Sequence, residues 1–482
     1  MTKNIRTFLE DLKREAPYEL AIINKKVDPA NYEVTAIIKH LQDMRKFPVL
    51  LFESPLNLKG EINEFRFITN IFTTKRKIEI ALGMPKERKR TELVEELLKR
   101  EEKKLKPVVI GKKEAPVKEV IHAGNEVDLR ELPIMKHYEL DGGPYIVLAS
   151  IGKDREKGIY NVSYHRMEVK ERNLTSFYVS PNNHMWKIFK GYEEKNEECP
   201  VVTVLGHHPA FYLGACYKGP FEMDEYEIIG DYLQEPLRLV PSETYQENFL
   251  VPADAEIIIE GALLPGKRLD EGPFGDTLGY VGPKKYQNSL WYEVRAITHR
   301  KNAIYESLLT PDEDKPWLDL AQEAAYFKRI KEVIPTVIDV CKGGRYAHYN
   351  VFISIKKMNE GDPGRAAAAA LSFTHTKNVF VFDEDIDIFN PTEILWALAT
   401  RVQPHKNIQI IKPLMRGDTV DPSLGEEKVT SVMIVDATKP LNQAYPPLSK
   451  CPDKVKTRIN LEDYIPREVL NSIPVDRTSY WG

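Results

Sequence analysis

Short apolar runs alternate with helical patterns along the first quarter of the chain. The segment Thr7-Phe-Leu-Glu10 has the form of a capping box and predicts that a helix begins there. Apolar runs at residues 21–23 and 48–52 have the length and composition of buried strands. From this alternation we predict a small α/β domain over residues 1–116.

Leucines recur at helical spacing in the charged stretch near the end of this domain. Leu93, Leu97 and Leu98 lie among Glu, Lys and Arg residues, which is typical of a solvated linker helix. A basic surface that binds nucleic acid usually carries charges of one sign. The acids between the lysines therefore argue against that function.

Between residues 117 and 310 the pattern changes to closely spaced β-prone runs separated by turn residues. The clearest runs are residues 145–149, 176–179, 200–204, 255–259 and 291–295. Frequent short strands of this kind predict a barrel or a sandwich.

Residues 311–482 return to alternating helix and strand patterns. An Ala-rich helix is predicted after Gly364, and an apolar strand at residues 378–382. A second helix is predicted to begin at Asn390-Pro391, because asparagine is a good N-cap and proline suits the first helical position. We predict a third domain of α/β type.

Length, charge and cysteine content limit the class of protein. A chain of 482 residues is expected to form two or three domains, and its formal net charge of −4 offers no field that would attract nucleic acid. The four cysteines form no Cys-x-x-Cys pair, which argues against zinc ribbons and disulfide frameworks. The chain contains no long uncharged apolar run, so neither a membrane span nor a signal peptide is predicted. We expect a soluble, cytoplasmic protein.

The segment Glu271-Gly-Pro-Phe-Gly-Asp276 places two carboxylates in backbone that glycine and proline keep from forming a helix. Two acids in different surroundings can differ in pKa, so that one stays ionised while the other carries a proton. Taken alone, the segment is interpreted equally well as a solvated turn.

A polar strand is predicted over the segment from Asn161 to Arg166. Strand alternation divides its residues between two faces: Asn161, Ser163 and His165 against Val162, Tyr164 and Arg166. Both faces carry polar groups, so the strand is predicted to line a site; an exposed edge strand is the alternative.

Asn161 and two further polar residues suggest a metal site. The amide of Asn161, the imidazole of His184 and the carboxylate of Glu225 form a plausible ligand set for a divalent ion such as Mn²⁺ or Mg²⁺ that also meets phosphate oxygens. The adjacent His207 and His208 are interpreted as surface imidazoles in a turn, because neighbours on an extended chain point in opposite directions.

Together these segments resemble the UbiD family of decarboxylases, which use prenylated flavin mononucleotide (prenylated FMN). The matching motifs, in chain order, are Asn161-x-x-x-x-Arg166, His184, Glu225-Tyr-x-x-x-Gly230, the strand at 251–261, Glu271–Asp276 with Gly279-Tyr280, the acidic run 383–387, and Trp396-Ala-x-Ala-Thr-Arg401. They cover most of the chain, and their order is specific.

The resemblance implies a three-domain fold of α/β (α+β) class, in which a central split β-barrel binds the flavin between an N-terminal and a C-terminal α/β domain. It implies that Asn161, His184 and Glu225 bind Mn²⁺ or Mg²⁺, which anchors the flavin phosphate. The residues implied to contact prenylated FMN are Asn161, Val162, Ser163, Tyr164, His165, Arg166, Asn183, His184 and Glu225. A K⁺ site stays open, because residues 216–224 do not reproduce the site of some members.

The resemblance also implies a catalytic trio of Arg166, Glu271 and Asp276. Loss of CO2 from an sp2 carbon leaves a carbanion that side chains alone cannot stabilise, so an electron-accepting cofactor is needed. We expect reversible, non-oxidative decarboxylation of an aromatic, heteroaromatic or α,β-unsaturated carboxylic acid. The alternatives are a non-catalytic flavin-binding scaffold subunit and an ordinary FMN reductase of the split-barrel type.

The expected partners follow from the same resemblance. They are the carboxylic acid substrate and CO2, a flavin prenyltransferase that supplies the cofactor, and further copies of this chain in a homodimer or higher oligomer. Neither nucleic acid nor a membrane is expected as a partner.

Overall fold

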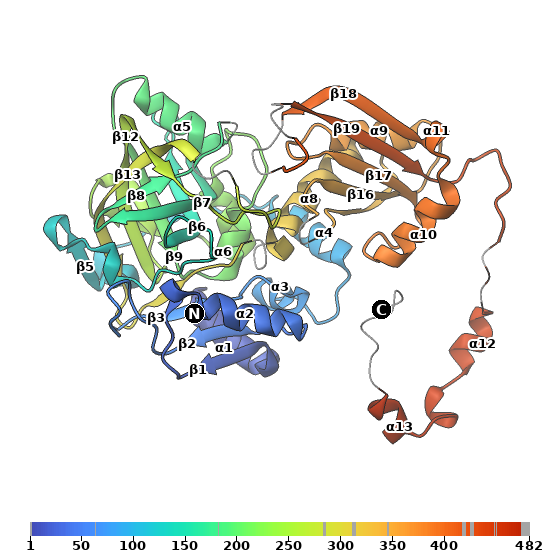
Figure 1. Ribbon diagram of the computed structural model, residues 1–482, viewed down its shortest axis with the longest axis horizontal. Coiled ribbons are helices and arrows are strands. Elements are labelled where there is room, and N and C mark those ends of the chain that lie inside the picture. Colours follow the sequence, from blue (N-terminus) through green and yellow to red (C-terminus); the bar gives the residue numbers. More distant parts are fainter. Residues whose placement is uncertain are drawn as a thin grey trace.

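The computed structural model describes residues 2–62, 64–181, 183–282, 286–310, 315–344, 347–416, 421–424, 429–447, 449 and 451–473. A β-barrel lies beside a C-terminal sheet, and the N-terminal sheet and its helices lie below the barrel in the view of Figure 1. Within the described part of the chain, helices long and apolar enough to cross a bilayer are absent.

The N-terminal part forms a four-stranded sheet covered by helices. Its strands β1 (Leu20–Ile23) and β2 (Val49–Phe52) are parallel, and β3 (Arg66–Thr69) is antiparallel to β2. The fourth strand, β14 (Ile304–Glu306), follows the barrel strands in sequence and pairs in parallel with β3. The helices are α1 (Ile5–Glu15), α2 (Glu33–Asp43), α3 (Lys75–Ala81) and α4 (Arg90–Arg100).

Helix α1 begins one turn earlier than predicted. Asn4 is its N-cap: the side-chain oxygen accepts the backbone N–H groups of Arg6 and Thr7 at 2.9 and 3.1 Å. The hydroxyl of Thr7 accepts the N–H of Asn4 at 3.0 Å and completes a capping box. The predicted position was wrong because asparagine caps as well as threonine, and Thr7 takes the N3 place in the box.

The middle of the chain forms a closed six-stranded barrel in the order β12-β9-β6-β7-β8-β13, with β13 pairing back to β12. The strands are β6 (Tyr145–Lys153), β7 (Tyr160–Glu171), β8 (Leu174–Phe177), β9 (Cys199–Leu205), β12 (Ile257–Glu271) and β13 (Tyr286–His299). This barrel confirms the predicted fold class. Strand β5 (Val120–Ala123) extends the sheet beyond β13, and β4 (Val108–Val109), β10 (Arg238–Ser242) and β11 (Gln246–Pro252) form a small separate sheet.

The long strand β12 ends at Glu271, one of the predicted site residues. Its register against β13 shifts between Glu260 and Gly261, and such bulges bend a strand around a barrel. A Cβ on Gly261 would lie 2.2 Å from the carbonyl oxygen of Glu293, so the strands approach too closely for a side chain there. Three helices accompany the barrel: α5 (His184–Glu193), α6 (Pro209–Gly214) and α7 (Glu225–Leu233).

His207 and His208 are buried, so the prediction of surface imidazoles was wrong. Nδ1 of His208 accepts the N–H of Ala210 at 3.2 Å and caps α6. The ring of Phe8 on α1 packs against His208 with centroids 5.9 Å apart. The sequence around the histidines does not indicate that α1 packs on them, because α1 is distant in the chain.

The C-terminal part is a five-stranded sheet in the order β15-β16-β17-β19-β18. Its strands are β15 (Val337–Cys341), β16 (Asn350–Ile355), β17 (Asn378–Asp383), β18 (Ile408–Arg416) and β19 (Val429–Ala437). The helices are α8 (Lys315–Val333), α9 (Asp362–Ala370), α10 (Pro391–Arg401) and α11 (Pro404–Asn407). The predicted Ala-rich helix, strand and capped helix correspond to α9, β17 and α10.

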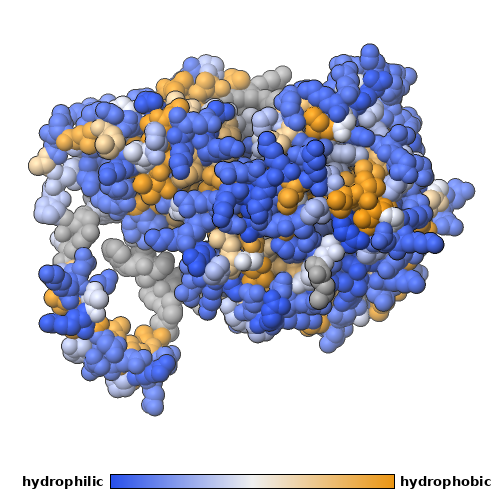
Figure 2. All heavy atoms as spheres, turned by 180° about the vertical axis from the view of Figure 1, so that it is seen from behind, coloured by the Kyte–Doolittle hydropathy of each residue, from blue (hydrophilic) through white to orange (hydrophobic). Residues whose placement is uncertain are grey.

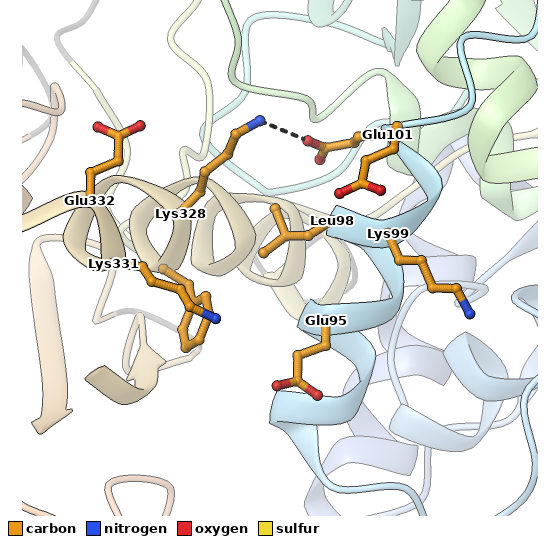
Figure 3. Close-up of a pocket in the computed structure, with 9 residues that line it drawn as sticks. Glu95, Leu98, Lys99, Glu101, Lys328, Lys331 and Glu332 are labelled. Atoms are coloured by element: carbon orange, nitrogen blue, oxygen red, sulfur yellow. Dashed lines mark ion pairs between the residues drawn. The ribbon is translucent and has the colours of Figure 1, made fainter. Parts of the chain in front are cut away.

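The charged stretch after the N-terminal sheet is the predicted linker helix, α4. Leu93 and Leu97 are buried, and α4 packs against α8 of the C-terminal part. Figure 3 shows an open groove between these helices, where Leu98 faces α8 and Lys328 pairs with Glu101 at 3.6 Å. The groove carries charges of both signs, which is typical of a solvated contact between two helices.

The end of the described chain extends away from the body as an arm (Figure 1). It carries α12 (Asp453–Arg458) and α13 (Arg467–Ser472). Apolar side chains are exposed along it, as Figure 2 also shows. They are Val455, Ile459, Leu461, Tyr464, Val469 and Ile473.

Candidate active site

Arg166, Glu271 and Asp276 converge at one end of the barrel. Arg166 lies on β7, Glu271 ends β12, and Asp276 lies in the loop that follows. Nε of Arg166 donates to Oε1 of Glu271 at 2.6 Å, and Nη1 donates to Oδ2 of Asp276 at 2.5 Å. One guanidinium therefore joins the two carboxylates of the Gly/Pro segment, and the solvated-turn interpretation does not hold.

Three aromatic rings surround this guanidinium. The ring centroids of Tyr178, Tyr286 and Phe274 lie 4.1, 4.6 and 4.9 Å from Cζ of Arg166. Such contacts stabilise a cation that is shielded from water. Burial alone would lower the pKa of Arg166, but the nearby carboxylate charges raise it well above its usual range.

The two carboxylates differ in their surroundings. Glu271 is fully buried, and its second oxygen, Oε2, accepts the hydroxyl of Ser289 at 2.7 Å. The side chain of Asp276 is 16% exposed, and its Oδ1 accepts the N–H of Thr277 at 2.6 Å. Glu271 is thus fixed on both oxygens, whereas Asp276 has access to water.

A cavity of about 180 Å³ lies beside Arg166 and Asp276. Its other lining side chains include Val147, Tyr164, His165, Asn183, Leu308 and Thr310. Nη2 of Arg166 is buried and makes no hydrogen bond of ordinary geometry to the described residues. A buried donor in this state is suited to an oxygen atom of a ligand.

Asn161 and Glu225 meet at the other end of the polar strand segment. Nδ2 of Asn161 donates to both carboxylate oxygens of Glu225, at 3.1 and 3.0 Å, and the N–H of Val162 donates to Oε2. Burial raises the pKa of Glu225 to about 8. The polar face predicted for this strand is present, since Oγ of Ser163 contacts Oδ1 of Asn161 at 3.2 Å and Nε2 of His165 at 2.9 Å.

His184 begins α5, with Asn183 as the N-cap residue. Its imidazole packs on Phe221, with ring centroids 5.3 Å apart, and Nζ of Lys187 and of Lys157 lie 3.8 and 5.7 Å from the same phenyl centroid. Among the described residues, no three His, Cys, Asp or Glu side chains are grouped closely enough to hold a metal ion. The predicted metal set contains only two such side chains and an amide.

Sequence reasoning missed the residues that anchor the loop after Glu271. Oε2 of Glu168 accepts the N–H of Gly272, and Oδ1 of Asp141 accepts the N–H of Gly275, both at 2.8 Å. Glu168 could have been found, because it lies two residues after Arg166 on the same strand and so on the same face. Asp141 precedes two glycines and has only the signature of a turn.

We predict that Gly142→Ala destabilises the protein by about 1–3 kcal/mol, the usual cost of overpacking. An added Cβ would lie 2.5 Å from the carbonyl oxygen of Gly272 and 2.9 Å from Oε1 of Glu168. Gly191→Ala is the matched control, since that glycine lies in α5 with no neighbouring atom within 4 Å of the added carbon. Thermal unfolding of both variants checks this; equal midpoints would contradict it.

Comparisons with known proteins agree along most of the chain. Residues 11–97, 108–313 and 317–437 match the N-terminal, Rift-related and C-terminal domains of 3-octaprenyl-4-hydroxybenzoate carboxy-lyase, known as UbiD. The anhydromevalonate phosphate decarboxylase of Methanothermobacter thermautotrophicus is 35% identical over 67% of this chain and 76% of its own. The phenolic acid decarboxylase of Sedimentibacter hydroxybenzoicus is 30% identical over 91% and 92%.

Solved structures give the same result. The UbiD-class enzyme HmfF from Pelotomaculum thermopropionicum, in complex with FMN, superposes with a TM-score of 0.85 at 32% identity, covering 96% of this chain and all of that one. An evolved dimeric form of the same enzyme, in complex with prenylated FMN, gives a TM-score of 0.81 at 31% identity over 96% of this chain and 100% of that one. The chain therefore belongs to the UbiD family of carboxy-lyases.

Proposed function

We propose that this enzyme uses prenylated FMN to decarboxylate, reversibly, an aromatic, heteroaromatic or α,β-unsaturated carboxylic acid. The observation that supports this most is the buried Arg166, which bridges Glu271 and Asp276 beside a cavity. The solved relatives that hold FMN and prenylated FMN support the choice of cofactor.

The chain's own groups fit the phosphate end of such a cofactor. Lys187 and Lys157 lie around Phe221, and the charge of Lys218 acts on His184 and Glu225. A group of cations of this kind suits a phosphate. We therefore place the flavin phosphate near the first turn of α5.

A divalent ion would complete that end of the site. Asn161, His184 and Glu225 would supply oxygen, nitrogen and oxygen ligands, which suit Mn²⁺ or Mg²⁺. A carboxylate buried without a cation tends to hold a proton, as the raised pKa of Glu225 indicates, and a bound ion would take the place of that proton.

When bound, prenylated FMN supplies the electron-accepting ring that carries the charge left as CO2 departs. Arg166 orients the substrate carboxylate through Nη2, a buried donor with no hydrogen bond of ordinary geometry to the described residues. Glu271, fixed by Ser289, holds the guanidinium in place. Asp276 delivers a proton to the carbon that has lost CO2 and takes another from water at its exposed edge.

The proposal is tested with protein co-expressed with a flavin prenyltransferase, the expected supplier of the cofactor. Mass spectrometry of the bound flavin should give the prenylated form. A panel of benzoate-like, furan, pyrrole, indole and cinnamate-type acids is then followed for CO2 release and for deuterium incorporation at the reacting carbon. At least one acid of the panel should release CO2 and incorporate deuterium at the reacting carbon.

Two other outcomes correspond to the alternative functions. Unmodified FMN that is bleached by a reduced nicotinamide would identify a flavin reductase. Prenylated FMN bound without reaction of any acid in the panel would identify a scaffold subunit. The bridged Arg166, Glu271 and Asp276 argue against both, because neither function needs this trio.

Glu225→Ala is predicted to lower the affinity for Mn²⁺ and for the flavin by at least about 10–100-fold, the range found when an outer-shell partner of a metal ligand is removed. The reason is that the buried carboxylate would be the only negatively charged ligand of the set. Metal analysis and flavin retention on a desalting column measure the effect, with Glu227→Ala on the same helix as the control. Removing the metal from the unaltered protein with a chelator should reproduce the loss, and equal metal content in both variants would contradict it.

We also propose that the chain forms a homodimer or higher oligomer. Apolar side chains are exposed on α10 and β18 of the C-terminal sheet, among them Leu395, Ile410 and Leu414. Exposed patches of this kind mark contact surfaces. Light scattering at several protein concentrations gives the assembly state.

A further inference from the structure

The loop that carries Asp276 is ordered by its own backbone. The N–H of Asp276 donates to the carbonyl of Tyr280 at 3.0 Å, and the N–H of Gly282 donates to that of Phe274 at 3.1 Å. These hydrogen bonds are internal to the loop. They determine its shape but not its position relative to the barrel.

The segment that precedes β6 attaches this loop to the barrel. The N–H of Gly142 donates to the carbonyl of Pro273 at 2.8 Å, and the N–H of Gly275 donates to Oδ1 of Asp141 at 2.8 Å. Gly275 directly precedes Asp276. Asp141 is therefore the side chain that holds the peptide next to the proposed proton donor.

Asp141 is only 4% exposed, and each of its oxygens has a backbone donor. Oδ2 accepts the N–H of Tyr138 at 2.8 Å, while Oδ1 accepts that of Gly275. A carboxylate can accept on both oxygens at once, whereas an asparagine has one oxygen and would turn its NH2 group toward a second N–H. The position thus calls for an acid and not merely for a polar residue.

The two segments are in direct contact at this point. A Cβ on Gly275 would lie 2.3 Å from Cδ2 of Tyr138, so the ring rests on the loop backbone. The hydroxyl of Tyr138 donates to the carbonyl of Thr310 at 2.8 Å, and Thr310 lines the cavity beside Arg166. Asp141 therefore lies where the loop of Asp276 and the cavity wall are joined.

We infer that Asp141 is a positioning residue, which fixes Asp276 relative to the reacting carbon through the N–H of Gly275. This inference rests on the proton-donor role proposed for Asp276. Misplacing a reacting group by about 1 Å can cost roughly 100-fold in rate, so a single lost anchor next to the donor has a large effect.

Asp141→Asn and Asp141→Ala test the inference, with Glu139→Ala as the control for removing an exposed acid from the same segment. For the acid that reacts fastest in the panel, both Asp141 variants should lower kcat by about 10–100-fold and change KM by less than about threefold. Flavin and metal content should stay as in the unaltered enzyme. Unchanged kcat, or a loss of flavin in proportion to the loss of rate, would overturn the inference.

A readout independent of activity is hydrogen–deuterium exchange of the peptide that spans residues 274–282. Loss of the Asp141 acceptor should speed exchange in this peptide and leave the peptides of β7 unchanged. This measurement stays informative even if no acid in the panel reacts, an outcome that would count against the proposed function alone. Unaltered exchange would overturn the anchoring role.

A double-mutant cycle separates positioning from general stability. If Asp141 acts through Asp276, then Asp141→Asn added to Asp276→Asn causes no further fall in the single-turnover rate of product formation. An additive fall in the double variant would show that Asp141 acts elsewhere and would overturn the inference.

Discussion

Asp276→Asn is expected to lower turnover by about 10²–10⁴-fold, the contribution usual for a general acid, while flavin and metal remain bound. The amide has nearly the shape of the carboxyl group and can still accept from Nη1 of Arg166, but it has no proton to deliver. Steady-state rates with the best acid of the panel measure the effect.

The control for this variant is Asp270→Asn. Asp270 is exposed and lies on the same strand as Glu271, one position earlier, so its side chain points to the other face. It should keep its rate within about twofold, since surface changes have small effects. An Asp276→Asn enzyme with rates like those of the control would remove Asp276 from the proposed mechanism.

Arg166→Lys is expected to lower both turnover and stability. A single ammonium cannot bridge Glu271 and Asp276 with the geometry of the guanidinium, and it loses the stacking on Tyr178. Leaving buried Glu271 without its partner costs about 3–5 kcal/mol in comparable pairs. We expect kcat/KM to fall at least about 100-fold, because both the donor proposed to bind the substrate carboxylate and the position of Asp276 are lost.

Arg401→Lys provides a matched control for the stability part. Its side chain, at the end of α10, is 1% exposed and pairs with Asp383 and Asp385 at 3.0 Å, in the C-terminal part of the chain away from the cavity. This variant should lose stability but keep its turnover. Denaturant unfolding and kinetics on both variants separate the two effects. If Arg166→Lys loses stability and keeps turnover, the role of Arg166 in substrate binding is wrong.

The sequence predicted local elements well because their causes are local. The turn residues between β-prone runs indicated the strands of the barrel, and Asn390-Pro391 indicated the start of α10, where the side chain of Asn390 accepts the N–H of Thr392 at 3.0 Å. The choice of a barrel over a sandwich came from the family resemblance. Closure of β12 on β13 depends on register between distant residues, which periodicity does not reveal.

The candidate site shows the same limit. Two acids could be recognised in the segment Glu271–Asp276, yet nothing near them in sequence indicates that Arg166 lies between them. The rings of Tyr178 and Tyr286 reach the guanidinium from separate parts of the barrel wall. Side chains that meet only in the folded chain were therefore predicted only where the family resemblance implied them. Asp141 was not predicted. The domain boundaries at 116 and 310 stay predictions.

The pairing of β14 with β3 has a consequence for how the chain is made. The ribosome must have synthesised the chain beyond residue 304 before β3 gains its second neighbour. Until then one border of the nascent sheet has unpaired N–H and C=O groups, the kind of edge on which aggregation begins. A fragment cut after residue 116 would keep that border permanently open, so the first quarter of the chain is poorly suited to expression by itself.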